Sequence, residues 1–363
     1  MTSPSPDTRP ADGRGTSPAT LRYFRWAFIV TFVGLALSAV LGWQSTGTVS
    51  GAATMFFICA VLAVLEISLS FDNAIVNANK LKDMQPVWQR RFLTWGIIIA
   101  VFGMRIVFPL AVVAIAARIG PIEAIRLAAT EPAEYARLMA EAHLAITAFG
   151  GAFLMMVGLS FFLDEHKDVD WLRRIERRLR SMGTIKGVTY GIVLLVVLLI
   201  GAQLPVADRA TFYQSAILGL VVFMAVETLS HVLDAGSTVK GAAASGGLGA
   251  FLYLEVLDAS FSFDGVIGAF ALTQNLFLIA IGLGIGAMYV RSMTIMLVEK
   301  QTLSHLPYLE HGAFYSIIAL AVIMFAQSLV HVPEVITGLL GAAIIGLSLW
   351  SSLRYNRRAA AAV

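Results

Sequence analysis

Two short segments of the chain carry the same unusual set of polar residues at the same spacing. Residues 64–75 read V-L-E-I-S-L-S-F-D-N-A-I, and residues 256–267 read V-L-D-A-S-F-S-F-D-G-V-I. Aligned without a gap, the two copies share an acid, a serine and a Ser-Phe-Asp run, and each copy lies inside a long apolar stretch. Acids are costly in such stretches and indicate a functional site. The repetition predicts a duplicated transporter whose single site is built from both copies.

The first copy divides its polar residues between two stripes of a helix with 3.6 residues per turn. Asp72 lies on one stripe, about a third of a turn from the other. A regular helix would therefore not direct Glu66 and Asp72 at one point. We expect a local break at residues 68–71, because transporter sites often use discontinuous helices. The other stripe is one narrow face that contains Glu66, Ser70, Asn73 and Asn77.

The chemistry of these residues favours a hard metal cation. Carboxylate, amide and hydroxyl oxygens are typical ligands of Mg²⁺, Ca²⁺ and Mn²⁺. Neither motif contains histidine or cysteine, which makes zinc and copper less favoured. Protons could compete for the same carboxylates, so metal/proton exchange is a further hypothesis. The expected charged ligands are Glu66, Asp72, Asp258 and Asp264, and the expected neutral ligands are Ser70, Asn73 and Ser262.

Two arginines lie in the spans that follow the motifs. We expect Arg105 and Arg291 to hold or gate the carboxylates when no metal is bound. The alternative is that they form structural ion pairs that help the helices to insert. Ion pairs alone would need neither the repeated serines nor the asparagine. Three further residues could extend the pathway: Glu227, Glu255 and Asn77.

The composition identifies the class of protein. Of 363 residues, 58% are hydrophobic and 13% are charged, and the mean hydropathy is +0.79. Soluble domains are about 25% charged, so we predict an all-α integral membrane protein with about ten transmembrane helices. The net charge is only +3, with no continuous basic stripe that would bind nucleic acid. The apolar segments are Trp26–Trp43, Ala52–Asn79, Phe92–Ala117, His143–Leu163, Val188–Leu204, Ala210–Leu233, Gly247–Thr273, Leu276–Val298, Gly312–Val330 and Pro333–Leu353.

Basic residues gather in alternate loops, which predicts the orientation of the chain. Both termini are expected in the cytoplasm of a multi-pass protein in the plasma (inner) membrane. The two motif spans would then run in opposite directions, as in an inverted repeat of three-helix units. Residues 164–186 are expected to form a charged, solvated helix. The predicted divisions are a disordered tail (1–20), a membrane domain (21–353) with repeats at about 52–163 and 247–330, and a cytoplasmic tail (354–363).

The motifs resemble those of a known membrane family. The segment from Glu66 through Asn73 resembles the acid–serine–Asp-Asn-Ala signature of the TerC family, in particular its uncharacterised branch, and Asp258 through Asp264 resembles its partner motif. The similarity covers about residues 52–353 and extends distantly to the LysE-type exporter superfamily. It implies export of divalent metal, chiefly manganese, with a historical link to tellurium resistance. This chain departs from the signature where Gly265 replaces the asparagine of the first copy.

These observations together predict an exporter of a hard divalent cation, with Mn²⁺ favoured as substrate. One alternative is an exporter of small organic solutes such as amino acids, which would need a cavity with apolar walls. Another is a non-transporting scaffold in a metal or tellurite stress complex. No hydrolase motif is present, so we expect neither an enzyme nor a bound cofactor. Membrane lipid is an expected partner, and the oligomeric state is left open.

Overall fold

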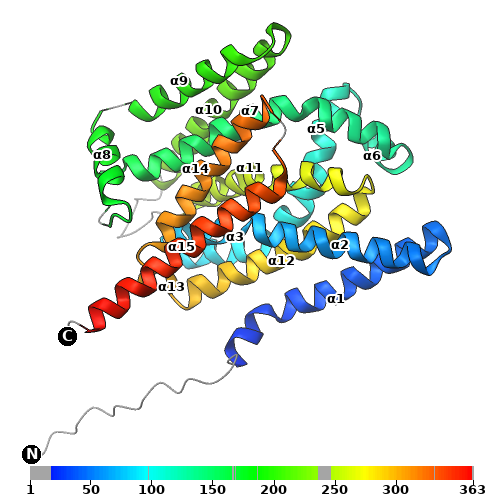
Figure 1. The fold of residues 1–363 in the computed structure, drawn as a ribbon, viewed down its shortest axis with the longest axis horizontal. Helices are drawn as coiled ribbons and strands as arrows, with labels where there is room; N and C mark the ends of the chain where they lie inside the picture. The colour runs from blue at the N-terminus through cyan, green and yellow to red at the C-terminus, as the bar shows by residue number, and fades with distance from the viewer. Residues whose placement is uncertain are drawn as a thin grey trace, which may run out of the picture.

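The computed structural model describes residues 18–361, apart from 97, 166, 168, 186, 236–246 and 331. Within these residues every regular element is a helix (Figure 1), and the chain is an all-α integral membrane protein as predicted. Most of the predicted tail, residues 1–17, lies outside the described residues. The helices are α1 (Pro18–Thr46), α2 (Val49–Leu69), α3 (Phe71–Lys82), α4 (Pro86–Arg91), the π-helices η1 (Phe92–Gly96) and η2 (Ile99–Val107), α5 (Phe108–Ala117), α6 (Pro121–Thr130), α7 (Pro132–Leu163), α8 (Arg173–Gly183), α9 (Val188–Gln203), α10 (Val206–Ala235), α11 (Leu248–Leu272), α12 (Leu276–Glu299), α13 (Thr302–His305), α14 (Leu309–Gln327) and α15 (Glu334–Ala361).

All ten predicted segments are helical, but fewer helices are long and apolar enough to span a membrane alone. Seven meet that requirement among the described residues: Leu21–Thr46, Val49–Leu69, Pro132–Leu163, Val206–Ser230, Leu276–Glu299, Leu309–Gln327 and Ile336–Ala359. Helix α9 has 16 residues, about 24 Å of rise, which is short of a bilayer core of about 30 Å. Helix α11 contains three acids, Glu255, Asp258 and Asp264, which raise its charge. Large apolar side chains such as Phe32 and Leu199 are exposed on α1 and α9, as lipid contact requires.

The third predicted span, Phe92–Ala117, is not one regular α-helix. Two π-helical stretches, η1 and η2, precede α5. Such stretches are rare and often lie at functional sites. Pro109 lacks the N–H that an α-helix would direct at the carbonyl of residue 105, and η2 ends just before it. The π-helix η2 therefore lies in the turns before Pro109, where the α-helical hydrogen bond to the carbonyl of residue 105 is missing.

One predicted boundary was wrong, and one helix continues beyond its predicted apolar segment. Helix α7 begins at Pro132, eleven residues before the predicted His143, so much of the predicted loop is helical. Arg137 forms ion pairs with Glu134 and Glu141 one turn away on either side, which supports helix in this polar stretch. Helix α15 runs on to Ala361 through most of the predicted tail, because that stretch ends in good helix formers.

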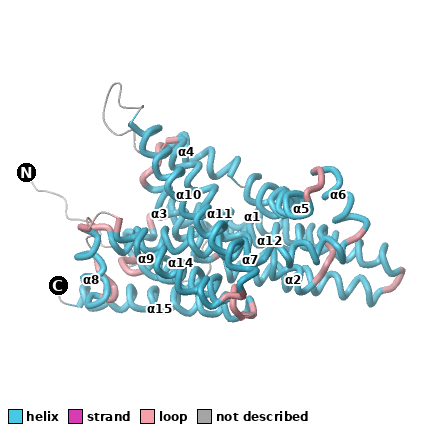
Figure 2. Tube along the Cα trace, turned by 90° about the horizontal axis from the view of Figure 1, so that it is seen from above, coloured by secondary structure: helices cyan, strands magenta, loops and turns pink. Residues whose placement is uncertain are grey.

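Contacts between the two predicted repeats are reciprocal. The first helix of repeat one, α2, packs on α12, while the first helix of repeat two, α11, packs on η2. The third helices, α7 and α14, pack on each other. A two-fold relation between the repeats produces such a pattern, although the inverted orientation stays a prediction. Peripheral elements flank this body: α8 lies at one end and α5 with α6 at the other (Figure 2).

The interior helices approach closely where the sequence is rich in glycine. The G-x-G-x-G pattern in α12 predicts close helix packing, not a nucleotide loop. A Cβ atom added to Gly282 would lie 2.6 Å from Leu62 Cβ of α2, so the pattern brings the two backbones together. The last glycine of the pattern, Gly286, lies against Glu66, so the first motif packs directly on α12.

Candidate functional site

The first motif is broken at Ser70, as predicted. Helix α2 ends at Leu69 and α3 begins at Phe71, and Ser70 between them has φ −102° and ψ 14°. The Ser70 hydroxyl donates to Glu66 Oε1 at 2.8 Å, while its N–H donates to the Glu66 carbonyl. In the second copy α11 continues unbroken from Leu248 to Leu272. Only one of the two copies therefore interrupts its helix.

Glu66 reaches across to the second repeat. Its side chain is 1% exposed. A Cβ added to Gly265 of α11 would lie 2.9 Å from Glu66 Oε2, and one added to Gly286 of α12 would lie 2.5 Å from Glu66 Cβ. Gly265 is the position that departs from the first copy, where Asn73 stands. The missing asparagine thus leaves the space in which the carboxylate of the other copy lies.

A direct hydrogen bond joins α3, just after the first motif, to the second motif. Asn77 Nδ2 of α3 donates to Asp258 Oδ1 of α11 at 2.8 Å, and both side chains are buried. Glu255 lies about one turn before Asp258 on the same helix and is also buried. Its Oε1 lies against Gly96 of η1, and neither of its oxygens has a hydrogen-bond partner among the described residues. This corner of the site therefore holds two acids and one amide.

Asp72 faces α14, a contact that the sequence did not predict. Its Oδ2 accepts a hydrogen bond of 2.8 Å from the Ser316 hydroxyl, and its Oδ1 accepts one from the N–H of Asn73. Asp72, Gly265, Ser316 and Thr337 help to line a small cavity of about 20 Å³. That volume holds about one water molecule. A single serine in an apolar helix is too common a feature to have identified Ser316.

Several predicted site residues lie elsewhere or outside the description. Glu227 is exposed on α10, where its Oε2 accepts a hydrogen bond from the Tyr190 hydroxyl at 3.4 Å. Arg291 donates to the Leu93 carbonyl at 2.9 Å, so its described contact is a backbone group of η1 and not the predicted carboxylate. The side chains of Arg105 and Asp264 are not described. The predicted neutral ligands Asn73 and Ser262 are both buried, and each has an oxygen without a partner in the described part of the chain.

The described acids do not gather into one metal-binding cluster. Among the described residues, no three acidic, histidine or cysteine side chains lie close enough to hold a metal ion together. Instead, three carboxylates each pair with a neutral group: Glu66 with Ser70, Asp72 with Ser316, and Asp258 with Asn77. The result is a set of buried oxygens along α2, α3, α11 and α14. These are ligand types that hard cations prefer.

A comparison with protein-family models matches residues 71–359 to DUF475, a family described as "Protein of unknown function". The matched region includes α3, α11, α12 and α14, which carry most of the buried polar groups. No curated protein and no solved structure gives a significant match. Because the family model covers well over half of the 363 residues, the chain belongs to the DUF475 family.

Proposed function

We propose that this protein is a membrane transporter for a hard divalent cation, which passes between the two motif copies. The observation that carries the proposal is the meeting of the two motifs in the interior, where Asn77 binds Asp258 and Glu66 lies against Gly265. Buried acids in a membrane body are costly, and they commonly mark ion pathways. A site shared by two repeats also lets each repeat move relative to the other.

The size of the cavity beside Asp72 supports an ion over a larger solute. The cavity beside Asp72 has a volume of about 20 Å³. A water molecule or a dehydrated cation fits such a space, whereas organic ligands occupy pockets of about 300–1,000 Å³. The lining also includes hydroxyl and carboxylate oxygens from Ser316 and Asp72. We therefore favour cation transport over export of amino acids.

The choice of Mn²⁺ and of outward transport rests on the resemblance to the TerC family. The oxygen ligands by themselves suit Mn²⁺, Mg²⁺ and Ca²⁺. The proposed location is the plasma (inner) membrane with both termini in the cytoplasm, which rests on the distribution of basic residues. In this proposal the metal is the substrate, and the protein carries out no covalent chemistry.

Metal flux in proteoliposomes tests the proposal. Purified protein is reconstituted with a Mn²⁺-sensitive dye inside the vesicles, and the initial rate is compared for wild type, D72N, D258N and D264N. The matched control is D208N, which removes an exposed carboxylate at the start of α10. We expect the three site variants to slow flux by roughly tenfold or more, the scale on which even outer-shell changes affect metal sites. Equal rates in all five proteins, or no flux above empty vesicles in wild type, would refute the proposal.

A further inference from the structure

Helix α8 runs across the end of the membrane bundle. It follows the span α7 and meets α9 at an angle of 108°. A helix nearly perpendicular to a membrane helix lies along the membrane surface. In Figure 1, α8 lies at the edge of the molecule, beside the ends of α7 and α9. Headgroups of the surrounding lipids are therefore within reach of its outer face.

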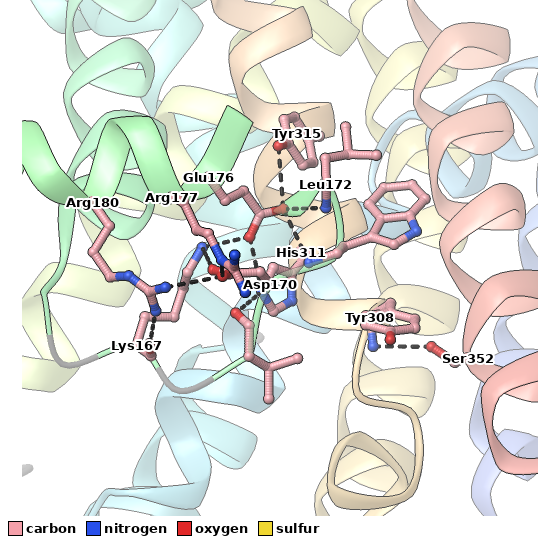
Figure 3. Close-up of polar contacts among 12 residues, drawn as sticks. Lys167, Asp170, Leu172, Glu176, Arg177, Arg180, Tyr308, His311, Tyr315 and Ser352 are labelled. Carbon is pink, nitrogen blue, oxygen red and sulfur yellow. Dashed lines mark hydrogen bonds and ion pairs between the residues drawn. The ribbon is translucent and has the colours of Figure 1, made fainter. Parts of the chain in front are cut away.

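The inner face of α8 is fixed to the bundle by a buried acid. Glu176 is fully buried, and its carboxylate lies 3.4 Å from His311 Nε2 of α14 (Figure 3). Gly183 lies against the Leu163 carbonyl at the end of α7, where a larger residue would not fit. These contacts set the rotation of α8 about its axis. The groups that donate hydrogen bonds to Glu176 are Lys167 Nζ at 2.6 Å, the N–H of Trp171 and of Leu172, and the Tyr315 hydroxyl.

Five arginines of α8 divide into two groups by their partners. Arg177 and Arg180 form ion pairs with Asp170, at 3.8 and 2.9 Å. The other three are exposed and form no ion pair with any described residue: Arg173, Arg174 and Arg178. We call Arg174 and Arg178 the arginine face, because Arg173 lies only about 60° from Glu176 around the helix axis. Because Glu176 points inward, helical spacing turns Arg174 and Arg178 toward the outside.

Apolar side chains border the arginine face. Ile175 is 52% exposed and Met182 is 39% exposed, and the two lie one above the other on α8. A charged face beside an exposed apolar edge is typical of helices that lie in the membrane interface. Free phosphate would contact the guanidinium groups but would make no use of the apolar edge. A phospholipid, with an anionic headgroup and acyl chains, matches both.

We propose that the arginine face binds the headgroups of anionic phospholipids in the adjoining leaflet, with Ile175 and Met182 against the acyl chains. Guanidinium groups form paired, charge-assisted hydrogen bonds with phosphate oxygens. The buried Glu176 network holds the arginines outward, so the surface exists before lipid binds. Because α8 joins α7 to α9, bound lipid would stabilise this end of the bundle. The inference is independent of which substrate the protein carries.

Lipid binding by the full-length protein in detergent tests the proposal. Native mass spectrometry counts phosphatidylglycerol and phosphatidylcholine retained by wild type, by R174Q/R178Q and by the control R357Q/R358Q. The control removes two exposed arginines from the end of α15. Basic residues near an anionic surface contribute about fivefold each, so we expect R174Q/R178Q to bind phosphatidylglycerol roughly 30-fold more weakly. The control and R174K/R178K should keep the preference for the anionic lipid.

Three results would overturn the proposal. Equal retention of phosphatidylglycerol by wild type and R174Q/R178Q would show that the arginines do not bind lipid. Equal loss in both glutamine variants would show only general charge attraction. Full displacement of the lipid by an equal concentration of inorganic phosphate would identify a site for free anions. Unchanged thermal unfolding of R174Q/R178Q in detergent without lipid serves as the check on folding. If R174Q/R178Q is unstable, R174K/R178K decides the outcome.

Discussion

Replacing Gly286 with alanine tests the contact between Glu66 and the second repeat. The new Cβ would lie 2.5 Å from Glu66 Cβ, closer than real Cβ atoms approach one another, and 3.2 Å from the Ala63 carbonyl oxygen, which is tighter than most such contacts. Both obstacles belong to the α2 backbone or lie next to it, so a change of rotamer cannot relieve them. Helices α2 and α12 would have to separate, and the Glu66 carboxylate would move away from Gly265.

The expected magnitude follows from two opposing effects. Overpacking in a well-packed core costs about 1–3 kcal/mol, whereas alanine in place of glycine within a helix gains about 1 kcal/mol. We therefore expect Gly286→Ala to lower the free energy of unfolding by about 0–2 kcal/mol. Gly346→Ala is the matched control, because an added Cβ there meets no atom within 4 Å. It should raise the free energy of unfolding by up to about 1 kcal/mol.

Thermal unfolding in detergent, followed by tryptophan fluorescence, compares the two variants with wild type. Gly286→Ala should unfold at a lower temperature than Gly346→Ala and should transport metal more slowly. If the two variants unfold at the same temperature and transport equally well, Glu66 does not pack against α12 as described. The reasoning about the shared site would then lose its geometric basis.

Two further substitutions test the partners of the other acids. Asn77→Ala removes the amide that donates to Asp258. The loss should lower the free energy of unfolding by about 1–3 kcal/mol, measured by thermal unfolding, and should slow metal flux, measured by vesicle uptake. Unchanged values in both assays would contradict the assignment. Ser316→Ala removes the hydroxyl that donates to Asp72. It should raise the metal concentration needed for half-maximal transport more than Ser292→Ala does, because the described hydrogen bond of the Ser292 hydroxyl is to the Met288 carbonyl of its own helix. Identical concentration dependence in the two serine variants would show that Ser316 has no role.

The sequence predicted the membrane class, the helical segments and the break at Ser70, because these depend on local composition and spacing. Acids inside apolar runs are visible without a structure, as are serines that repeat at the same offsets. The break followed from the angle between Glu66 and Asp72 on a regular helix. Their burial in the interior agrees with the expectation that membrane acids face inward.

The partners of these residues could not be predicted from the sequence, because they depend on packing between distant segments. Ser316 is 244 positions from Asp72, and only the contact of α14 with α3 brings the two together. We expected Arg291 to hold or gate a carboxylate, but its guanidinium donates to the Leu93 carbonyl. Leu93 lies in the π-helical stretch η1, which the sequence did not predict.

The two motif copies differ in structure, and the difference between Asn73 and Gly265 accompanies the structural one. In the first copy the helix is interrupted at Ser70, Asn73 is present, and the Glu66 side chain lies against Gly265 of the second copy. The second copy has Gly265 at the equivalent position, stays helical and provides the space that Glu66 occupies. Restoring asparagine at Gly265 would place a side chain where the carboxylate now lies. The departure from the repeated motif is therefore a requirement of one asymmetric site, because two identical copies could not both project an acid into the same gap.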